Sequence, residues 1–318
     1  MHKNTIQNNT SPTTSADPDH AAKGIIALVV ATLFFAAQDA ITKHLTQSIS
    51  VAQIVTVRFF FFSLFACIYA ARSMDIRVAF HSLRPKLQIL RGLLICAEIA
   101  LFAFALHHLG LAEMHAIFAC FPLIITALSV PFLGESVGWR RWMAVGLGFI
   151  GTLIIIRPGS EIFSPYAMIA LACALMFAIY NLITRKVSRH DRFEPSLLYF
   201  GVVGFIGSLV VVPFYWQTPN SDQVFWLGVI SITGIVGHLL LIKALQLAPA
   251  VILQPFNYFI LLWAMIIGYS VYGEVLQTNK LIGATLVVIS GIYIARREYA
   301  VARETRKRLR HSMYPPEV

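Results

Sequence analysis

The chain has 318 residues, of which 58% are hydrophobic and 13% are charged, whereas ordinary soluble domains carry about 25% charged residues. This composition excludes a typical soluble domain and indicates that the bilayer surrounds most of the chain. The formal net charge is +10. However, the basic residues lie between apolar segments and near the C-terminus without interleaved aromatic residues, so we do not expect nucleic-acid binding.

The apolar segments predict an all-α integral membrane protein. Residues 1–22 are rich in Asn, Thr, Ser and Pro and predict a disordered tail. No small-residue cleavage site closes the apolar stretch from Gly24, so we expect a first spanning helix there rather than a signal peptide. Windows of about 19 residues predict ten spans, at 24–42, 51–71, 88–107, 112–133, 142–156, 165–184, 196–216, 224–243, 251–272 and 281–295.

Basic residues predict the orientation of these spans, because Lys and Arg near span ends are retained in the cytoplasm. With both termini inside, 21 basic residues are cytoplasmic, Lys43, Arg157 and Lys280 are external, and Arg58 lies within a span. The opposite orientation would invert this asymmetry. We therefore expect both termini, including the basic tail 298–318, on the cytoplasmic side of a bacterial inner membrane.

The chain also contains an internal repeat, which divides it into halves at 23–157 and 158–297. A shift of 142 residues places LFFAAQDAITK, which begins at Leu33, on LMFAIYNLITR. A shift of 139 places Gly134-Glu135 on Gly273-Glu274. Because each half has five spans, the two halves are expected to have inverted topology, with a substrate site near the midplane at the seam between them.

Two segments carry a family resemblance. They are ALHHLGLAEMHAIFACFPLIITALSVPFLGE, followed by a span ending LIIIRPG, and KALQLAPAVILQPFNYFILLWAMIIGYSVYGE, followed by LIGATLVVISGIYIARR. They resemble the two halves of an EamA-type transporter of the drug/metabolite transporter superfamily, and the likeness covers roughly residues 23–298. The resemblance implies a ten-helix basket with a central cavity. It also implies a carrier of amino acids, vitamins, nucleotide-like metabolites, sugars or drugs that needs no organic cofactor.

The second copy departs from the first at one proline. Pro122 corresponds to Leu261 under the shift of 139, so the kink expected in the fourth span need not recur in the ninth.

Charged residues within spans are costly and therefore mark candidate functional positions. Asp39 lies four residues before Lys43 on the first span, and Arg58 lies about two turns into the second. The three are expected to form one ionic cluster near the outer face. It either clasps the first two helices together or leaves Arg58 free to bind a substrate carboxylate.

Glu98 and His238 are expected to face the transport cavity from opposite halves. They are 140 residues apart, close to the repeat shift, and both lie near the middle of their spans. A buried carboxylate that releases its proton when substrate or water enters would couple transport to protons. The alternative is that each side chain bridges neighbouring helices by a hydrogen bond.

Further polar residues are candidates for lining the cavity. His115 follows His107, His108 and Glu113, but this spacing crosses a loop and fits no established ligand pattern, so we expect no metal site. His115 is expected to face the cavity. Its counterpart in the second copy is Gln254, which with Asn257 and Tyr258 is expected to line the inner half. Asn181 is a further candidate for substrate binding or coupling.

Other features are expected to be structural. The Gly-Glu pairs at 134 and 273 suit a helix cap followed by a carboxylate that holds the next helix start. The aromatic run Phe59–Phe62 is expected to face lipid or to pack, and the four cysteines lie in apolar runs typical of packing.

The sequence fits two other function classes less well than a transporter. A membrane-embedded enzyme would need a catalytic constellation, and the chain has no HExxH or GxSxG motif. A sensor or scaffold would need an output domain, and the connections are too short for one. The sequence therefore favours a transporter of a small polar or amphipathic metabolite, with protons as the candidate coupling ion.

Overall fold

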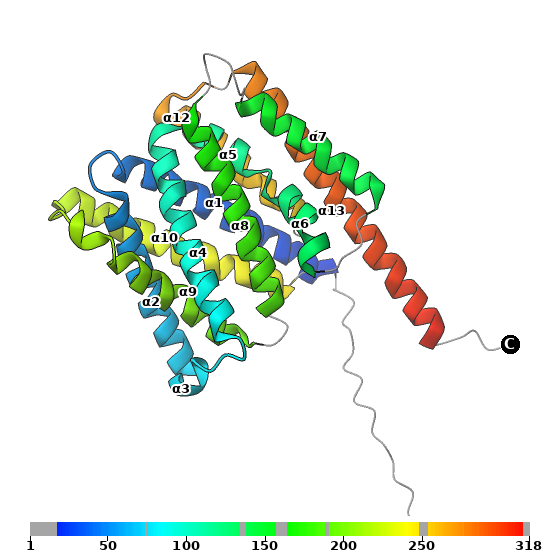
Figure 1. Ribbon diagram of the computed structural model, residues 1–318, viewed down its shortest axis with the longest axis horizontal. Helices are drawn as coiled ribbons and strands as arrows, with labels where there is room; N and C mark the ends of the chain where they lie inside the picture. Colours follow the sequence, from blue (N-terminus) through cyan, green and yellow to red (C-terminus); the bar gives the residue numbers. More distant parts are fainter. Residues whose placement is uncertain are drawn as a thin grey trace, which may run out of the picture.

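In the computed structural model the protein is a bundle of helices (Figure 1), and every described element is helical. The structure describes residues 18–73, 75–133, 138–156, 164–187, 191–247, 254–275 and 277–313. The elements are α1 (Pro18–Leu45), α2 (Val51–Ser73), α3 (Ile76–Ala79), α4 (Pro85–His108), α5 (Leu111–Phe118), α6 (Phe121–Leu133), α7 (Trp139–Ile156), α8 (Pro165–Val187), α9 (Phe193–Leu209), η1 (Val212–Phe214), α10 (Ser221–Leu247), η2 (Gln254–Tyr258), α12 (Phe259–Tyr272) and α13 (Thr278–Met313).

Six of the described helices are long and apolar enough to cross a membrane, and they coincide with predicted spans one, two, three, six, seven and eight. The other four predicted spans fall on shorter apolar helices, at Leu111–Ile125, Trp142–Ile156, Phe256–Tyr272 and Thr278–Tyr293. The helices nearest the two ends of the chain are longer than the predicted spans. Helix α1 begins at Pro18, inside the expected tail, and α13 continues through the basic segment to Met313.

The fourth predicted span is broken into α5 and α6 at Ala119 and Cys120. The backbone N–H of Ala119 still bonds to His115 O, but that of Cys120 turns to Ile117 O, which tightens the chain before Pro122. A similar change occurs in the ninth span, where the 3₁₀ helix η2 passes into α12 at Phe259. The irregularity therefore recurs 139 residues later, although Leu261 replaces the proline.

Helices distant in sequence pack in pairs. Helix α1 packs on α10, α2 on α9, α4 on α8, and α7 on α13, while α5 contacts α12. The pair α7 and α13 runs along one edge of the bundle in Figure 1. Gly151 and Gly283 let these two backbones touch, because a Cβ on Gly283 would lie 2.5 Å from the carbonyl oxygen of Gly151. Small residues at such crossings are typical of helix pairs in membranes.

Candidate functional site

A pocket lies between helices of both halves of the chain. Its cavity volume is about 30 Å³, within about 350 Å³ of unfilled space that includes open solvent. Most of its wall is apolar or aromatic, and a few polar groups interrupt that wall, which is the usual make-up of a small-molecule site. Its lining residues come from α1, α2, α4, α9 and α10: Gln38, Arg58, Phe59, Phe62, Ile99, Phe200, Ile230, Ser231, Gly234, Ile235 and His238.

Among the described residues that line the pocket, Arg58 is the only charged one. Asp39 and Glu98 are the carboxylates whose charges act on its guanidinium. Among the described residues, no carboxylate oxygen lies within 4.0 Å of it, and none of its five N–H groups has a hydrogen-bond acceptor. The pocket therefore contains a guanidinium inside an apolar span whose N–H donors have no acceptor among the described residues.

The aromatic wall of the pocket comes from α2, α9 and α10. The ring centroids of Phe62 and Phe200 are 4.7 Å apart, and those of Phe62 and His238 are 5.3 Å apart. Gly204 allows α9 to approach this wall, because a Cβ there would lie 2.3 Å from the Phe59 ring. The run 59–62 divides into two packed rings, which also line the pocket, and two exposed rings, which agrees with the expectation that it packs or faces lipid. Phe59 and Phe62 face the pocket, while Phe60 and Phe61 are exposed on the outer surface.

Two of the residues that line this pocket also carry hydrogen-bond acceptors. His238 Nδ1 lies 2.8 Å from the carbonyl oxygen of Gly234. Because a carbonyl only accepts, Nδ1 carries the hydrogen, and Nε2 of the neutral ring is an acceptor. Gln38 Oε1 is buried and has no hydrogen-bond donor within the described part of the chain. The pocket thus combines a cationic donor with acceptors for N–H or O–H groups.

Glu98 and His115 lie behind the pocket wall rather than in it. Glu98 on α4 is 4% exposed, and the charges of Asp39 and Arg58 act on its carboxylate. His115 on α5 is buried, with Nε2 3.2 Å from Asp39 Oδ2 but not aligned for a hydrogen bond. The structure therefore brings Asp39, Arg58, Glu98 and His238 into one electrostatic cluster, and it places His115 beside Asp39 instead of facing the cavity.

Three polar candidates of the second half, Asn181, Asn257 and Tyr258, are not among the residues that line the described pocket. Asn181 donates from Nδ2 to the carbonyl oxygen of Phe177 on its own helix, at 2.7 Å. The Tyr258 hydroxyl is buried against Gly291, without a hydrogen-bond partner among the described residues. Asn257 is half-buried and does not line the pocket. The side chain of Gln254 lies outside the described residues.

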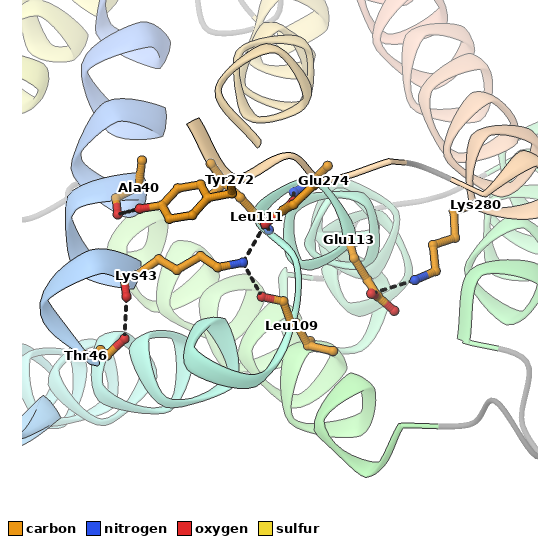
Figure 2. Close-up of polar contacts among 10 residues, drawn as sticks. Ala40, Lys43, Thr46, Leu109, Leu111, Glu113, Tyr272, Glu274 and Lys280 are labelled. Atoms are coloured by element: carbon orange, nitrogen blue, oxygen red, sulfur yellow. Dashed lines mark hydrogen bonds and ion pairs between the residues drawn. The ribbon is translucent and has the colours of Figure 1, made fainter. Parts of the chain in front are cut away.

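A second polar cluster joins the two halves of the chain near the end of α1 (Figure 2), and we name its central pair the Lys43–Glu274 clasp. Lys43 Nζ lies 2.5 Å from Glu274 Oε1 and also donates to the carbonyl oxygen of Leu109 at 2.9 Å. Glu274 Oε1 accepts from the backbone N–H of Leu111 at 2.9 Å, and Oε2 accepts from that of Ala112 at 3.3 Å. The carboxylate therefore occupies the N-terminus of α5, where the helix dipole favours negative charge.

The clasp changes two of the expectations for these residues. Lys43 pairs with Glu274 rather than joining Asp39 and Arg58 in one cluster. Gly273 does cap α12, in the left-handed conformation with φ 63°, as expected. Glu274 holds the start of α5 in the first half, however, rather than the start of the helix that follows it. The corresponding pair Gly134-Glu135 lies outside the described residues.

Long apolar helices around a partly polar pocket define an integral membrane protein that handles a small solute. A model of the EamA-like transporter family matches residues 22–157 and 164–296, so the chain belongs to that family. It is therefore a membrane transporter of small molecules rather than an enzyme. This confirms the resemblance drawn from the two repeated segments.

Several curated proteins are similar to the chain over most of its length. The S-adenosylmethionine uptake transporter of Rickettsia conorii is 28% identical, covering 81% of this chain and 87% of that protein. The riboflavin transporter of Vibrio cholerae serotype O1 is 26% identical, covering 90% and 97%. The pseudopaline exporter of Pseudomonas aeruginosa is 24% identical, covering 87% and 98%. A solved crystal structure shares the fold, with a TM-score of 0.59 and 17% identity, covering 88% of this chain and 98% of that one.

Proposed function

We propose that the protein is a secondary transporter that works by alternating access and moves a small polar or amphipathic metabolite across the bacterial cytoplasmic membrane. In this proposal ten spans form two inverted five-helix halves, with both termini in the cytoplasm. The two separate matches of the family model, at 22–157 and 164–296, support two homologous halves. The basic residues concentrated on one side of the predicted spans support the orientation.

The helix pairing supports an axis between the halves. Each span of the first half has an equivalent in the second, so α1 is equivalent to α8 and α10 is equivalent to α4. Under this equivalence the contact between α1 and α10 corresponds to the contact between α8 and α4, and both contacts are present. In the same way the contact between α1 and α12 corresponds to the contact between α8 and α6, which is also present. Pairs formed by equivalent spans, such as α2 with α9 and α7 with α13, lie on the axis itself. This is the pattern expected of inverted repeats with a site at their seam.

Arg58 carries the assignment of the pocket as the substrate site. A guanidinium inside a span is costly unless it has a partner, and in the described residues Arg58 has none within ion-pair distance. A substrate carboxylate or other acid group would supply a partner and accept two parallel hydrogen bonds. We therefore propose that the substrate has an acidic group that binds Arg58.

The rest of the pocket suggests the other parts of the substrate. Phe59, Phe62 and Phe200 offer an apolar wall for a hydrocarbon or planar ring, while Gln38 Oε1 and His238 Nε2 suit N–H or O–H donors. The named substrates of the relatives, S-adenosylmethionine, riboflavin and pseudopaline, support a metabolite over an inorganic ion or a polymer.

Glu98 and His238 are the proposed coupling groups. Both are enclosed within spans, and the charge of Arg58 acts on each. An acid group arriving at Arg58 changes the charge balance of this cluster, so substrate binding and the protonation of Glu98 become linked. Such linkage is what a proton-coupled carrier requires.

A ligand screen tests the pocket assignment. Purified protein is heated with a panel of acidic metabolites and with the methyl ester of each hit, because a ligand that binds the folded state raises the apparent melting temperature. We expect the acids to stabilise the protein and their esters to do so much less. Arg58→Gln should weaken the hit by about tenfold or more, as expected for a lost charge-assisted pair. Arg140→Gln, on the exposed end of α7, is the matched control and should bind normally. Equal responses to acid and ester would contradict the role of Arg58.

A further inference from the structure

We propose that the Lys43–Glu274 clasp is the gate that closes the substrate pocket at the Lys43 end of the bundle, and that this pair must break each time the pocket opens to that side. The inference rests on the proposed alternating access. By the distribution of basic residues, this end faces the outside of the cell.

The clasp joins the two halves that alternating access must separate. Lys43 is on α1, and the backbone groups of Leu109, Leu111 and Ala112 lie where α4 passes into α5. Glu274 follows α12 in the other half, and Tyr272 beside it donates its hydroxyl to the carbonyl oxygen of Ala40 at 2.6 Å. Figure 2 shows Lys43 and Leu111 meeting the Glu274 carboxylate, with the bond from Tyr272 to Ala40 beside them. Rocking of one half against the other cannot open this end while they remain in contact.

The clasp is also close to the pocket along the same helix. Gln38 lines the pocket, and Lys43 is five residues further along α1. At a rise of 1.5 Å per residue, this places Lys43 about 7.5 Å beyond the pocket lining. Asp39, between them, contacts His115 of α5. One short stretch of α1 therefore carries both a pocket residue and the residue that seals the end.

The contacts around Glu274 suit a pair that opens and closes. The side chains of Lys43 and Glu274 are 13% and 17% exposed, so water can hydrate both charges when they part. The Glu274 carboxylate sits against two glycines, because a Cβ on Gly110 or Gly268 would lie 2.9 Å or 2.8 Å from Oε2. The space beside these glycines fits a carboxylate that enters as the two halves come together. The N-terminus of α5 then binds that carboxylate.

The chain supplies a matched control pair at the same end. Lys280 Nζ of α13 lies 2.6 Å from Glu113 Oε2 of α5, and these side chains are 19% and 18% exposed. This pair resembles the clasp in distance and exposure. It also joins the two halves, but through α13 rather than α1, the helix that carries pocket residue Gln38, and it does not involve the N–H groups at the start of α5. Its loss should therefore leave the gate closed.

Access of a thiol reagent to the pocket tests the gate without any substrate. Ser231, which lines the pocket, is replaced by Cys in a chain whose four native cysteines are replaced by Ala, and sealed vesicles receive a charged, impermeant maleimide. A Ser50→Cys chain marks the side on which the end of α1 is exposed, because Ser50 lies in the link that follows α1. Labelling from that side reports the open-gate population.

We expect Lys43→Gln and Glu274→Gln each to raise the labelling rate of Ser231→Cys about tenfold, as expected for loss of a charge-assisted pair that stabilises the closed state. The two together should act no more strongly than either alone, because they remove one shared interaction. Lys43→Arg should label near the parental rate, which controls for misfolding, and Lys280→Gln should do the same.

Parental labelling rates in Lys43→Gln and Glu274→Gln would overturn the gate. So would an equal acceleration by Lys280→Gln, because the effect would then be general loosening of this end. Labelling needs no substrate, so failure of the gate is distinguishable from failure of the transport proposal, which solute flux decides.

Discussion

Lys43 Nζ and Glu274 Oε1 are 2.5 Å apart although 231 residues separate them in the chain. Their pairing joins the first predicted span to the end of the ninth, and the same carboxylate completes the N-terminus of α5. A local reading of the sequence pairs Lys43 with Asp39, one turn away on the same helix. Lys43 pairs with Glu274 instead of Asp39 because the N–H groups of α5 already hold the Glu274 carboxylate in place.

The loops that share an end of the bundle give a topology prediction. Ser50 Oγ donates to the carbonyl oxygen of Tyr215, so the links α1–α2 and α9–α10 lie together. Ser82 Oγ donates to the Asp191 carboxylate, so the links α2–α4 and α8–α9 also lie together. Single cysteines at Ser50 and Ser221 should label from outside intact cells, and one at Arg192 only after permeabilisation. The reverse pattern would overturn the proposed orientation.

Asp39 and Arg58 should be energetically coupled. Each is a charge within a span, and the charge of Asp39 acts on Arg58. Removing one leaves the other poorly compensated, so Asp39→Asn plus Arg58→Gln should destabilise less than the sum of the singles, by about 1 kcal/mol. Thermal unfolding of the purified variants measures this coupling. Asp39→Asn combined with the exposed Arg140→Gln is the control and should be additive. Additivity in both pairs would show that Asp39 and Arg58 act independently.

Gly204 should be intolerant of a side chain because it sets the aromatic wall of the pocket. A Cβ there would lie 2.3 Å from the Phe59 ring, whereas a Cβ on Gly228 of α10 would meet nothing within 4 Å. Gly204→Ala should cost about 1 to 3 kcal/mol of stability through overpacking and should weaken ligand binding as Phe59 is displaced. Gly228→Ala should leave both unchanged. Thermal-shift titrations of the two variants check this, and equal behaviour would remove Phe59 from the site.

Glu98 and His238 give a prediction about proton coupling. Glu98→Gln keeps the size and hydrogen bonding of the side chain but cannot titrate, so it should fold and exchange solute while losing the response of net transport to an imposed pH gradient. His238→Gln should reduce that response as well. Transport is measured in liposomes at several internal and external pH values. If both variants respond to pH like the parent, the two residues serve helix packing.

Hydropathy predicted the helices well because it is a local property: each expected span falls on an apolar helix. The break before α12 escaped prediction because no proline occupies the position of Pro122 in the second copy. The continuation of α13 to Met313 was missed because its basic end is not apolar.

The site was harder to predict than the fold. Arg58 and His238 could be found because polar residues within spans are rare. Phe59 and Phe62 escaped notice because a run of four aromatic residues does not reveal which side faces the pocket. The signal that could have found them is their spacing of three residues, which starts next to Arg58 and places both rings on the same side of the helix as each other. Glu98 was found but lies behind the wall, since its depth could be predicted and its direction around the helix could not.

Flux through the Arg58 pocket is the most direct test of the account. The ligand identified by thermal shift is presented to sealed liposomes containing either the parent protein or Arg58→Gln, with Arg140→Gln as control, and the solute is recovered and analysed. The account predicts entry of chemically unchanged solute with the parent and with Arg140→Gln, and a rate about tenfold or more lower with a folded Arg58→Gln. Parental flux in Arg58→Gln would contradict the pocket assignment, and no flux with any of the three would contradict the transport proposal itself.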